Sequence, residues 1–340
     1  MYNPRNTGQR ERIEMAIKTT IIPIASGKGG VGKSFLTANL SAGIAELGYS
    51  TVVVDLDLGG SNLYTYLGIP NKHPGIGDYL KGKKLKFNDL LVSTGISNLK
   101  YIPGDGRTPF MANISYAQRM TLLRKIKQLP ARYVLLDLGS GSTFNTLNFF
   151  GIAHKGIIVT TSEVPSIMNF LAFLRNFMFY IILNVASHNK EALKMLITAF
   201  RQPIKSEPLT VKSLLNKISD VDSNLAIKAH DLCRNYRPRI IINMGDSADE
   251  LKILRRIDDI LKTRLSIEAD YFGFIYYDDV ARRSVQNRET LFARYPQCIT
   301  SKSIKHVARR ITKIWDQPVE NSMVRLFEDT KRKHALWKAY

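Results

Sequence analysis

A glycine-rich segment near the start of the chain has the residue types and the spacing of a phosphate-binding loop. Residues 27–34 match the pattern Gly-x-x-x-x-Gly-Lys-Ser. Glycines let successive backbone N–H groups curl around phosphate oxygens, the lysine reaches the β- and γ-phosphates, and the serine hydroxyl is a ligand for Mg²⁺. We therefore expect a nucleoside triphosphate to bind here. The residues expected to hold it are Gly27, Lys28, Gly29, Gly30, Val31, Gly32, Lys33, Ser34 and Phe35.

Such a loop needs a strand before it and a helix after it, because the helix N-terminus adds the positive end of its dipole to the phosphate site. Residues 20–25 form an apolar run of strand length. Residues 34–47 carry apolar side chains at helical spacing, and Gly48 then provides a helix stop. This context favours a ligand site over a glycine-rich turn that binds nothing.

Short apolar runs recur along the chain, separated by segments with helical periodicity. Most are apolar throughout, as strands must be when both faces of a parallel sheet are covered. The predicted fold class is therefore α/β, with a doubly wound, mostly parallel sheet flanked by helices. The runs lie at residues 20–25, 51–55, 133–137, 156–161 and 239–243, with a sixth candidate at 271–276.

Three carboxylates stand where two of these strands end. Asp55 and Asp57 close one run, and Asp137 closes another. Each of them alone could be a helix cap or a turn residue. Together with the phosphate loop they favour a Mg²⁺ site, because the metal of a bound triphosphate needs carboxylates to hold its waters and to orient an attacking water. The predicted metal set is Ser34, Asp55, Asp57 and Asp137.

A second lysine, Lys28, stands near the start of the loop in the run Lys-Gly-Gly-Val-Gly-Lys-Ser. This run resembles the deviant Walker A motif of the MinD/ParA/Mrp family of P-loop ATPases. The resemblance implies an ATP-dependent homodimer in which Lys28 reaches the phosphates held by the other subunit. It also implies ATP/ADP and Mg²⁺ as cofactors, with Lys28, Lys33 and Asp57 as catalytic residues, and slow turnover without a partner.

Two further segments resemble the switches of this family. Residues 55–63 are similar to switch I, in which Asp57 matches the aspartate that positions the hydrolytic water and Asn62 matches a family asparagine. Residues 137–141 look like the Walker B strand running into switch II. The Asp-x-Gly-x-Gly form of switch II and a later Tyr-Asp-Asp-Val run look closest to the MinD/FlhG (FleN) branch.

The residues expected to bind the nucleotide base match the family motifs at some positions and differ from them at others. Asn243 resembles the asparagine that reads adenine, and Asp278 ends a segment similar to the family's Gly-x-Ile-Pro-x-Asp. Tyr276 replaces the proline of that segment, which bears on base preference. Residues 8–14 do not reproduce the Asp-Gln-Ala-x-x-Leu-Arg motif with which FlhG proteins stimulate their GTPase partner.

The predicted organisation has one main domain with appendages. Residues 1–19 form an N-terminal extension and residues 20–295 the P-loop ATPase domain. A polar stretch at about 187–238 reads as a helical insertion, longer than this family usually shows. Residues 296–340 form a basic, helical C-terminal region. The apolar run 164–185 is long enough to cross a bilayer, but polar residues and an arginine interrupt it, which favours a helix buried in the core or in a subunit interface.

The charge balance points to an anionic partner. The formal net charge is +20, and the last sixty residues carry 14 Lys/Arg against 5 Asp/Glu. Residues 320–340 mix apolar and basic side chains that could lie on an anionic membrane, although a helix packed on its own domain or a solvated tail fits as well. Non-specific DNA is the alternative surface. Only two cysteines and no secretory signal pattern agree with a reducing, cytoplasmic setting.

Three classes of function follow from the resemblance. We expect a MinD/FlhG-type ATPase that regulates the placement or number of a structure such as the flagellum or the division site, under the control of a protein activator. The alternative is a ParA-like DNA-associated partitioning ATPase. An Mrp-like carrier of metal clusters is disfavoured, because no Cys-x-x-Cys is present to hold a cluster.

Overall fold

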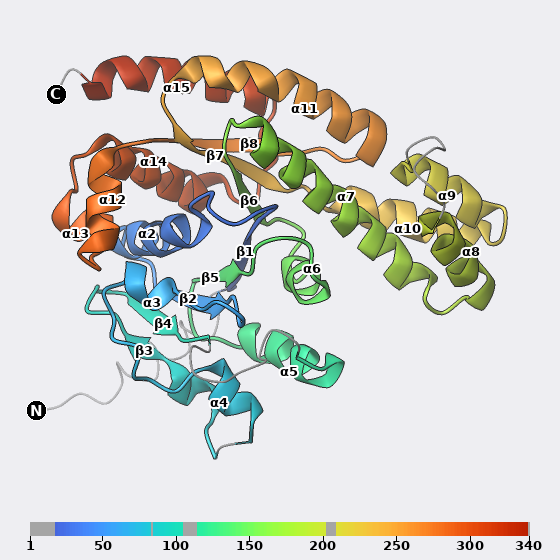
Figure 1. Ribbon diagram of the computed structural model, residues 1–340, viewed down its shortest axis with the longest axis horizontal. Helices are drawn as coiled ribbons and strands as arrows, with labels where there is room; N and C mark the ends of the chain where they lie inside the picture. The colour runs from blue at the N-terminus through green and yellow to red at the C-terminus, as the bar shows by residue number, and fades with distance from the viewer. Residues whose placement is uncertain (1–17, 83, 105–113, 202–208, 339–340) are drawn as a thin grey trace, which may run out of the picture.

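The computed structural model describes residues 18–82, 84–104, 114–201 and 209–338, and its centre is an eight-stranded sheet with helices on both faces (Figure 1). The strand order is β3-β4-β2-β5-β1-β6-β7-β8, and all neighbours are parallel except β3 and β4. The predicted doubly wound, mostly parallel sheet is confirmed. The strands are β1 (Thr20–Ser26), β2 (Thr51–Leu56), β3 (Val92–Ser93), β4 (Leu99–Ile102), β5 (Tyr133–Leu138), β6 (Ile157–Thr160), β7 (Arg239–Gly245) and β8 (Asp270–Tyr276).

Each of the six predicted runs is a strand, but β3 and β4 at one edge of the sheet were not predicted. β3 contains only two residues, and in β4 the exposed Lys100 alternates with the buried Leu99 and Tyr101. A search for runs that are apolar throughout therefore misses them. Residues 8–14 and nearly all of the predicted N-terminal extension, residues 1–19, lie outside the described residues.

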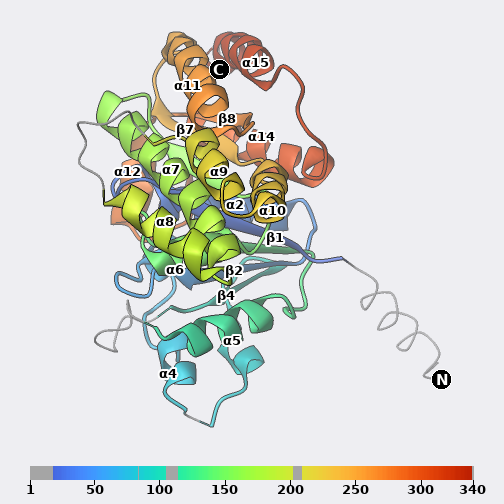
Figure 2. The ribbon, with the colours of Figure 1, turned by 90° about the vertical axis from the view of Figure 1, so that its right-hand side faces the viewer.

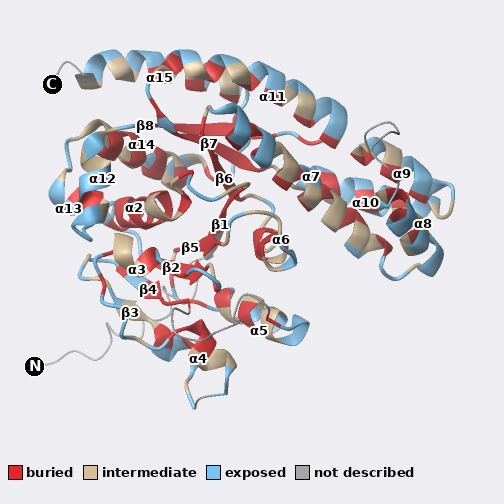
Figure 3. Cartoon of the chain, in the orientation of Figure 1, coloured by how far each residue is buried: buried red, intermediate tan, exposed pale blue. Residues whose placement is uncertain are grey.

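Successive residues of the central strands contribute to two separate hydrophobic cores, because they point to opposite faces of the sheet. On β2, Val52 and Val54 join one core and Val53 joins the other. Figure 3 shows this burial concentrated on the strands and on the inner sides of the helices. One face is covered by α2 (Lys33–Glu46), α13 (Leu291–Arg294) and α14 (Ile299–Ile314); the other is covered by α5 (Tyr116–Ile126), α6 (Phe144–Phe150), α7 (Val164–Ala186), α11 (Leu254–Ile260) and α15 (Ser322–Lys338).

The shorter elements lie mainly between strands β2 and β4 and after strands β7 and β8. They are α3 (Leu63–Tyr66), α4 (Ile76–Leu80), η1 (Phe87–Leu90), η2 (Ala248–Ile253), η3 (Leu261–Leu265) and α12 (Asp279–Gln286). The predicted helix at 34–47 is α2, which begins one residue earlier and ends one residue earlier.

The apolar run at 164–185 is the long helix α7. By length and composition alone it is the one helix of the described residues that could cross a membrane, but half of its most apolar window is buried within the protein. Phe170, Phe173, Leu174 and Phe177 on one side of the helix pack into the core. The structure thus contains the core helix that the interrupted apolar pattern favoured.

The segment predicted as a helical insertion contains three helices that lie side by side at one end of the molecule (Figure 2). They are α8 (Lys190–Phe200), α9 (Val211–Ser219) and α10 (Ser223–Asn235). α10 packs against both α7 and α9. Its buried positions are the small residues Ala226, Ala229 and Cys233, which allow close approach between the helices.

Both C-terminal helices pack on the sheet. α14 contacts α2 and β8, and α15 lies along β8 on the opposite face. Leu326 and Thr330 of α15 are buried, whereas Val324 and Leu336 are exposed. Of the alternatives for this region, the structure contains the helix that is packed on its own domain.

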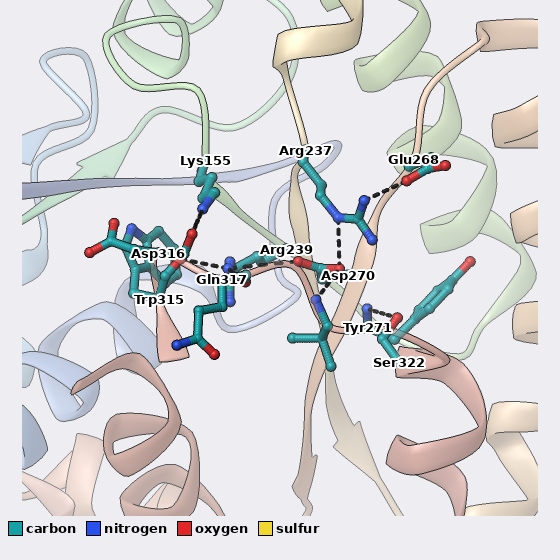
Figure 4. A network of polar contacts seen from close by, with 11 residues as sticks. Lys155, Arg237, Arg239, Glu268, Asp270, Tyr271, Trp315, Asp316, Gln317 and Ser322 are labelled. Carbon is teal, nitrogen blue, oxygen red and sulfur yellow. Dashed lines mark hydrogen bonds and ion pairs between the residues drawn. The ribbon is translucent and has the colours of Figure 1, made fainter. Parts of the chain in front are cut away.

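A buried arginine on β7 fixes the segment between these two helices (Figure 4). The guanidinium of Arg239 is fully buried between the rings of Phe272 and Trp315, 4.4 and 4.5 Å from their centroids. Its Nη2 donates to the carbonyl oxygens of Trp315 and Gln317, and it lies 3.7 Å from the buried carboxylate of Asp270. Burial lowers the pKa of Arg239 to about 10, so the group remains charged at neutral pH. The segment that follows α14 is thereby tied to β7, the strand next to the edge strand β8.

Candidate functional site

The glycine-rich loop joins β1 to α2 at the carboxyl edge of the sheet. Gly30 and Gly32 have φ of 84° and 80°, a left-handed conformation that glycine adopts without steric cost. The Ser26 hydroxyl donates to the Lys28 carbonyl across the loop at 2.9 Å. A Cβ on Gly27 would lie 2.2 Å from the carbonyl oxygen of Asn169, so the loop packs directly against α7. The local geometry is that of a loop curled in front of a helix N-terminus.

Lys33 connects this loop to the neighbouring strand β5. Its Nζ donates to Asp137 Oδ1 at 2.7 Å, and both side chains are buried, with 6% and 1% exposed. The same nitrogen lies 3.2 Å from Ser34 Oγ. The Thr37 hydroxyl, one turn further along α2, also donates to Asp137 Oδ1 at 3.1 Å. Three of the predicted phosphate and metal residues are therefore in direct contact, and Thr37 is an addition that the motif did not indicate.

Asp55 is directed into the protein and organises the segment that follows it. Its carboxylate accepts hydrogen bonds from the Ser61 hydroxyl at 2.5 Å and from the N–H groups of Leu63 and Asp57 at 3.2 and 3.1 Å. Burial, reinforced by the charge of Asp137, raises the pKa of Asp55 to about 7. Asp55 is absent from the lining of the cavity described below, and its predicted role toward Mg²⁺ stays a prediction.

Asp57 does line that cavity, and desolvation raises its pKa. A Cβ on Gly139 would lie 3.4 Å from Asp57 Oδ1, so the two segments that resemble the switches meet at this carboxylate. Asn62 is exposed at the start of α3 and is not part of the lining. The structure therefore brings Asp57 to the phosphate loop but leaves Asn62 outside it.

A cavity of about 620 Å³ opens in front of the loop, within the range of about 300–1,000 Å³ that is usual for small-molecule sites. Asn243 at the end of β7 closes one side, and its Nδ2 donates to the Val31 carbonyl at 2.8 Å. Asp278 caps α12 by accepting from the Val280 N–H at 3.1 Å. The predicted residues that line the cavity are Lys28, Gly29, Gly30, Val31, Gly32, Lys33, Ser34, Phe35, Asp57, Asn243 and Asp278.

Other residues line the cavity without having been predicted for it. Four of them come from α12, beyond the Tyr-Asp-Asp-Val run, where the sequence contains no motif that could have identified them. Tyr276, noted only as a departure from the family proline, is among the lining residues as well. The additional residues are Ser26, Tyr66, Ser140, Met244, Tyr277, Ala281, Arg282, Val285, Gln286 and Thr300.

The donor groups suit a metal that arrives with a nucleotide. Among the described residues no three His, Cys, Asp or Glu side chains gather closely enough to hold an ion by themselves. Mg²⁺ keeps several waters and is usually bound through one or two protein oxygens plus the phosphates of the substrate. The hydroxyl of Ser34 and the carboxylates around it match that requirement.

The sequence profile of the CobQ/CobB/MinD/ParA nucleotide binding domain matches residues 22–291. This chain belongs to that family. The match covers the whole sheet except the start of β1, together with α2 and the cavity up to α12. Nucleotide binding at the glycine-rich loop is therefore a property of the family to which the chain belongs.

Some curated relatives match most of the chain, and others match a little less than half of it. It is 22% identical over 301 residues to the antiactivator FleN of Pseudomonas aeruginosa, covering 88% of each chain. It is 29% identical over 247 residues to the flagellum site-determining protein YlxH of Helicobacter pylori, covering 70% of this chain and 76% of YlxH. A putative septum site-determining protein MinD of Tupiella akineta is 31% identical over 160 residues, 47% of this chain. The chain spans about half the length of that and several other MinD relatives.

Solved structures agree with the fold. MinD of Pyrococcus horikoshii, determined in complex with Mg-ADP, has a TM-score of 0.59 at 18% identity and covers 88% of this chain and 98% of that one. A ParA family ATPase of Chlorobium tepidum has a TM-score of 0.55 at 19% identity, covering 86% and 99%. The resemblance to the MinD/ParA class that the loop indicated is thus confirmed at the level of family and fold.

Two glycine substitutions should separate backbone strain from steric conflict in the loop. Alanine at either Gly30 or Gly32 must adopt a positive φ, which costs about 1–2 kcal/mol. A Cβ on Gly30 meets nothing within 4 Å, whereas one on Gly32 would lie 2.4 Å from Asn243 Nδ2 and 2.9 Å from Met244 Cε. We expect Gly32→Ala to lose about 1–3 kcal/mol more of unfolding free energy than Gly30→Ala, because it overpacks a fixed contact.

Urea unfolding of the nucleotide-free variants measures this difference. Equal losses of unfolding free energy in the two variants would contradict the close contact between Gly32 and Asn243. Gly30→Ala is the matched control, since it shares the backbone conformation but not the neighbour.

Proposed function

We propose that this protein is an ATP-dependent dimerising switch that hydrolyses ATP to ADP and phosphate. The observation that carries the proposal is the different position of two lysines in one loop. Lys33 is buried beside Asp137, whereas Lys28 lines the same cavity with 33% of its side chain exposed and lies 3.8 Å from Glu163. Lys33 is therefore engaged within its own subunit, and Lys28 is accessible to a second one.

Exposed apolar side chains near the loop support a dimer interface on this side of the molecule. Phe144 at the start of α6 and Val164 and Met168 at the start of α7 are 67%, 70% and 62% exposed. Glu163, the ion-pair partner of Lys28, immediately precedes α7. Large apolar side chains that remain exposed together commonly become covered in an assembly. A second copy bound here would cover them and bring its own Lys28 to the nucleotide.

In this mechanism the backbone N–H groups of the loop and Lys33 hold the phosphates, and the Ser34 hydroxyl binds Mg²⁺. When bound, the metal neutralises negative charge that develops on the transferred phosphoryl group. Asp57 accepts a hydrogen bond from the attacking water and orients it. Asp137 positions Lys33 and would hold waters of the bound Mg²⁺. Turnover is slow while the chain is alone, because a site completed by a second subunit hydrolyses ATP only after assembly.

We further propose that the site prefers adenine. The side-chain amide of Asn243 stands at the end of β7, where it lines the cavity beside Asp278. Tyr276 lies on the same side, and its ring stacks on His334 of α15 at a centroid distance of 4.9 Å. The tyrosine thus takes the place of the family proline without removing Asn243 from the cavity.

The cellular role that we propose is the regulation of the placement or number of a structure such as the flagellum or the division site. It is supported by the similarity to FleN and YlxH over most of the chain and to MinD over about half of it. In this role the protein works in the cytoplasm, hydrolysis is timed by a protein activator, and the ATP dimer associates with the inner face of the cell membrane.

Substitution of Lys28 tests the switch. We expect Lys28→Ala to bind a fluorescent ATP analogue nearly as well as the natural protein, because Lys33 and the loop N–H groups remain. We also expect it to stay monomeric in ATP and to lose at least about 100-fold in hydrolysis rate, as when one preorganised charged group is removed from a transition state.

Size-exclusion chromatography with light scattering, in ATP and in ADP, measures the association. Lys72→Ala, at an exposed position that does not line the cavity, is the matched control. An ATP-dependent dimer and normal hydrolysis in Lys28→Ala would exclude the deviant Walker A mechanism.

Membrane association would involve the C-terminal region, which is docked in this structure. Leu326 and Thr330 are buried against the domain, and the Tyr276 hydroxyl donates to the Thr330 carbonyl at 3.0 Å. We propose that α15 exchanges these contacts for an anionic lipid surface when the ATP dimer forms. The basic residues among residues 325–333 provide the electrostatic attraction.

Vesicle sedimentation tests this part of the proposal. We expect the ATP form to sediment with vesicles that contain phosphatidylglycerol, and deletion of residues 324–340 to abolish sedimentation. Equal binding in ATP and ADP, or binding unaffected by the deletion, would contradict it. Retardation of duplex DNA at low salt, without vesicle binding, would favour the DNA surface instead.

A further inference from the structure

A second cavity of about 840 Å³ lies away from the glycine-rich loop, in a groove between α5, α6, α7 and α10. In Figure 1 α10 lies at the right-hand end of the molecule beside α7, with α6 and α5 below α7, and α10 belongs to the segment predicted as an insertion. The two cavities have no lining residue in common. This groove is thus a separate surface feature, built from four stretches of chain that are distant in sequence.

Half of the residues that line the groove have apolar or aromatic side chains. Leu123 of α5, Ile181 of α7 and Leu232 of α10 contribute to it from three sides. Tyr180 and Tyr236 add aromatic surface, and Met120 at the margin is 43% exposed. An apolar groove between helices is the kind of surface into which the apolar side of an amphipathic helix fits.

The charged groups that line the groove are all basic. They are Arg124 of α5, Lys127 directly after that helix and Lys228 of α10; His188 also lines the groove, and no Asp or Glu is among the lining residues. In the part of the chain that the structure describes, no ion pair neutralises Arg124, Lys127 or Lys228. The groove therefore combines an apolar interior with a positive margin.

We propose that this groove binds an acidic amphipathic helix of a partner protein. Charge complementarity decides the occupant. Residues 1–17 of this chain carry three arginines against two glutamates, and a second copy of the chain brings a net charge of +20, so neither complements a basic margin. A partner helix with leucine-like residues at i, i+3 or i+4, and i+7, flanked by carboxylates, matches both the interior and the margin.

The groove is also connected to the segment after Asp137. Asn148 of α6 and Ile152, two residues after that helix, form one wall, and the first residue of α6, Phe144, contacts the ring of Tyr180 edge-on at 6.3 Å. Asn176 of α7 donates to the Ser142 hydroxyl at 2.9 Å. A helix bound against Tyr180 would therefore affect the position of residues 142–144. Because these residues follow Asp137 in the chain, binding of a partner in the groove could act on the nucleotide site.

The test uses the full chain without nucleotide, so that its result is independent of whether the protein hydrolyses ATP. The probes are a panel of fluorescein-labelled synthetic 18-residue helices with the same leucine pattern, flanked either by glutamates or by lysines. Fluorescence anisotropy measures binding to the natural protein, to Lys127→Glu/Lys228→Glu, and to Lys212→Glu/Lys217→Glu. The last pair makes the same change in charge at exposed positions on α9, outside the groove.

We expect at least one acidic helix to bind at least about tenfold more tightly than its basic counterpart. The groove variant should weaken that binding by about tenfold or more, whereas the α9 variant should change it less than about twofold, because rim charges act mainly on partners that contact them. Equal binding of acidic and basic helices, no binding by any acidic helix, or equal effects of the two variants would overturn the proposal. Vesicles containing phosphatidylglycerol form a further arm, and their binding in place of the acidic helices, lost only in the groove variant, would also overturn it.

Discussion

The buried contact between Lys33 and Asp137 is the interaction on which the rest of the site depends. It joins the first residue of α2 to the end of β5, and both side chains are almost fully removed from solvent. Two such charges are stable in the interior only as partners, since removing either leaves an uncompensated charge at a cost of about 3–5 kcal/mol. The contact therefore fixes the glycine-rich loop against the central strands and sets the position from which Lys33 meets a phosphate.

The order of the strands places β5 beside β1, from which the loop leads to Lys33, and it adds a second carboxylate next to Asp137. β5 lies between β1 and β2, and Asp55 is the register partner of Asp137. Both carboxylates are buried, and burial, reinforced by the charge of Asp137, raises the pKa of Asp55. Hydrogen bonds from Ser61 and Leu63 hold Asp55 in place, and this arrangement presents Asp57 to the cavity.

The sequence was sufficient for those features that depend on local pattern. Central strands are buried on both faces, so they can be recognised in the sequence as continuous apolar runs. The loop motif identifies Lys33 and Ser34 as phosphate and metal residues. The sequence was insufficient where the environment of a residue depends on packing partners from distant parts of the chain. Lys100 interrupts the apolar pattern of β4, the strand next to the edge strand β3, and Asn62 matches a motif but remains exposed. The apolar residues of α15 have a spacing that fits contact with lipid as well as contact with β8. Only the packing in the structure distinguishes these two possibilities. The groove beside α10 could not be predicted, because four helices assemble it.

The central claim is that the nucleotide site is completed by a second copy of the chain. The most direct measurement is the ATP hydrolysis rate per chain as a function of protein concentration, at saturating ATP and Mg²⁺. If two subunits share the site, the rate per chain should rise with concentration and reach a plateau as the dimer becomes the dominant species seen by light scattering. A rate per chain that is constant from a concentration where the protein is monomeric to one where it is dimeric would contradict the account.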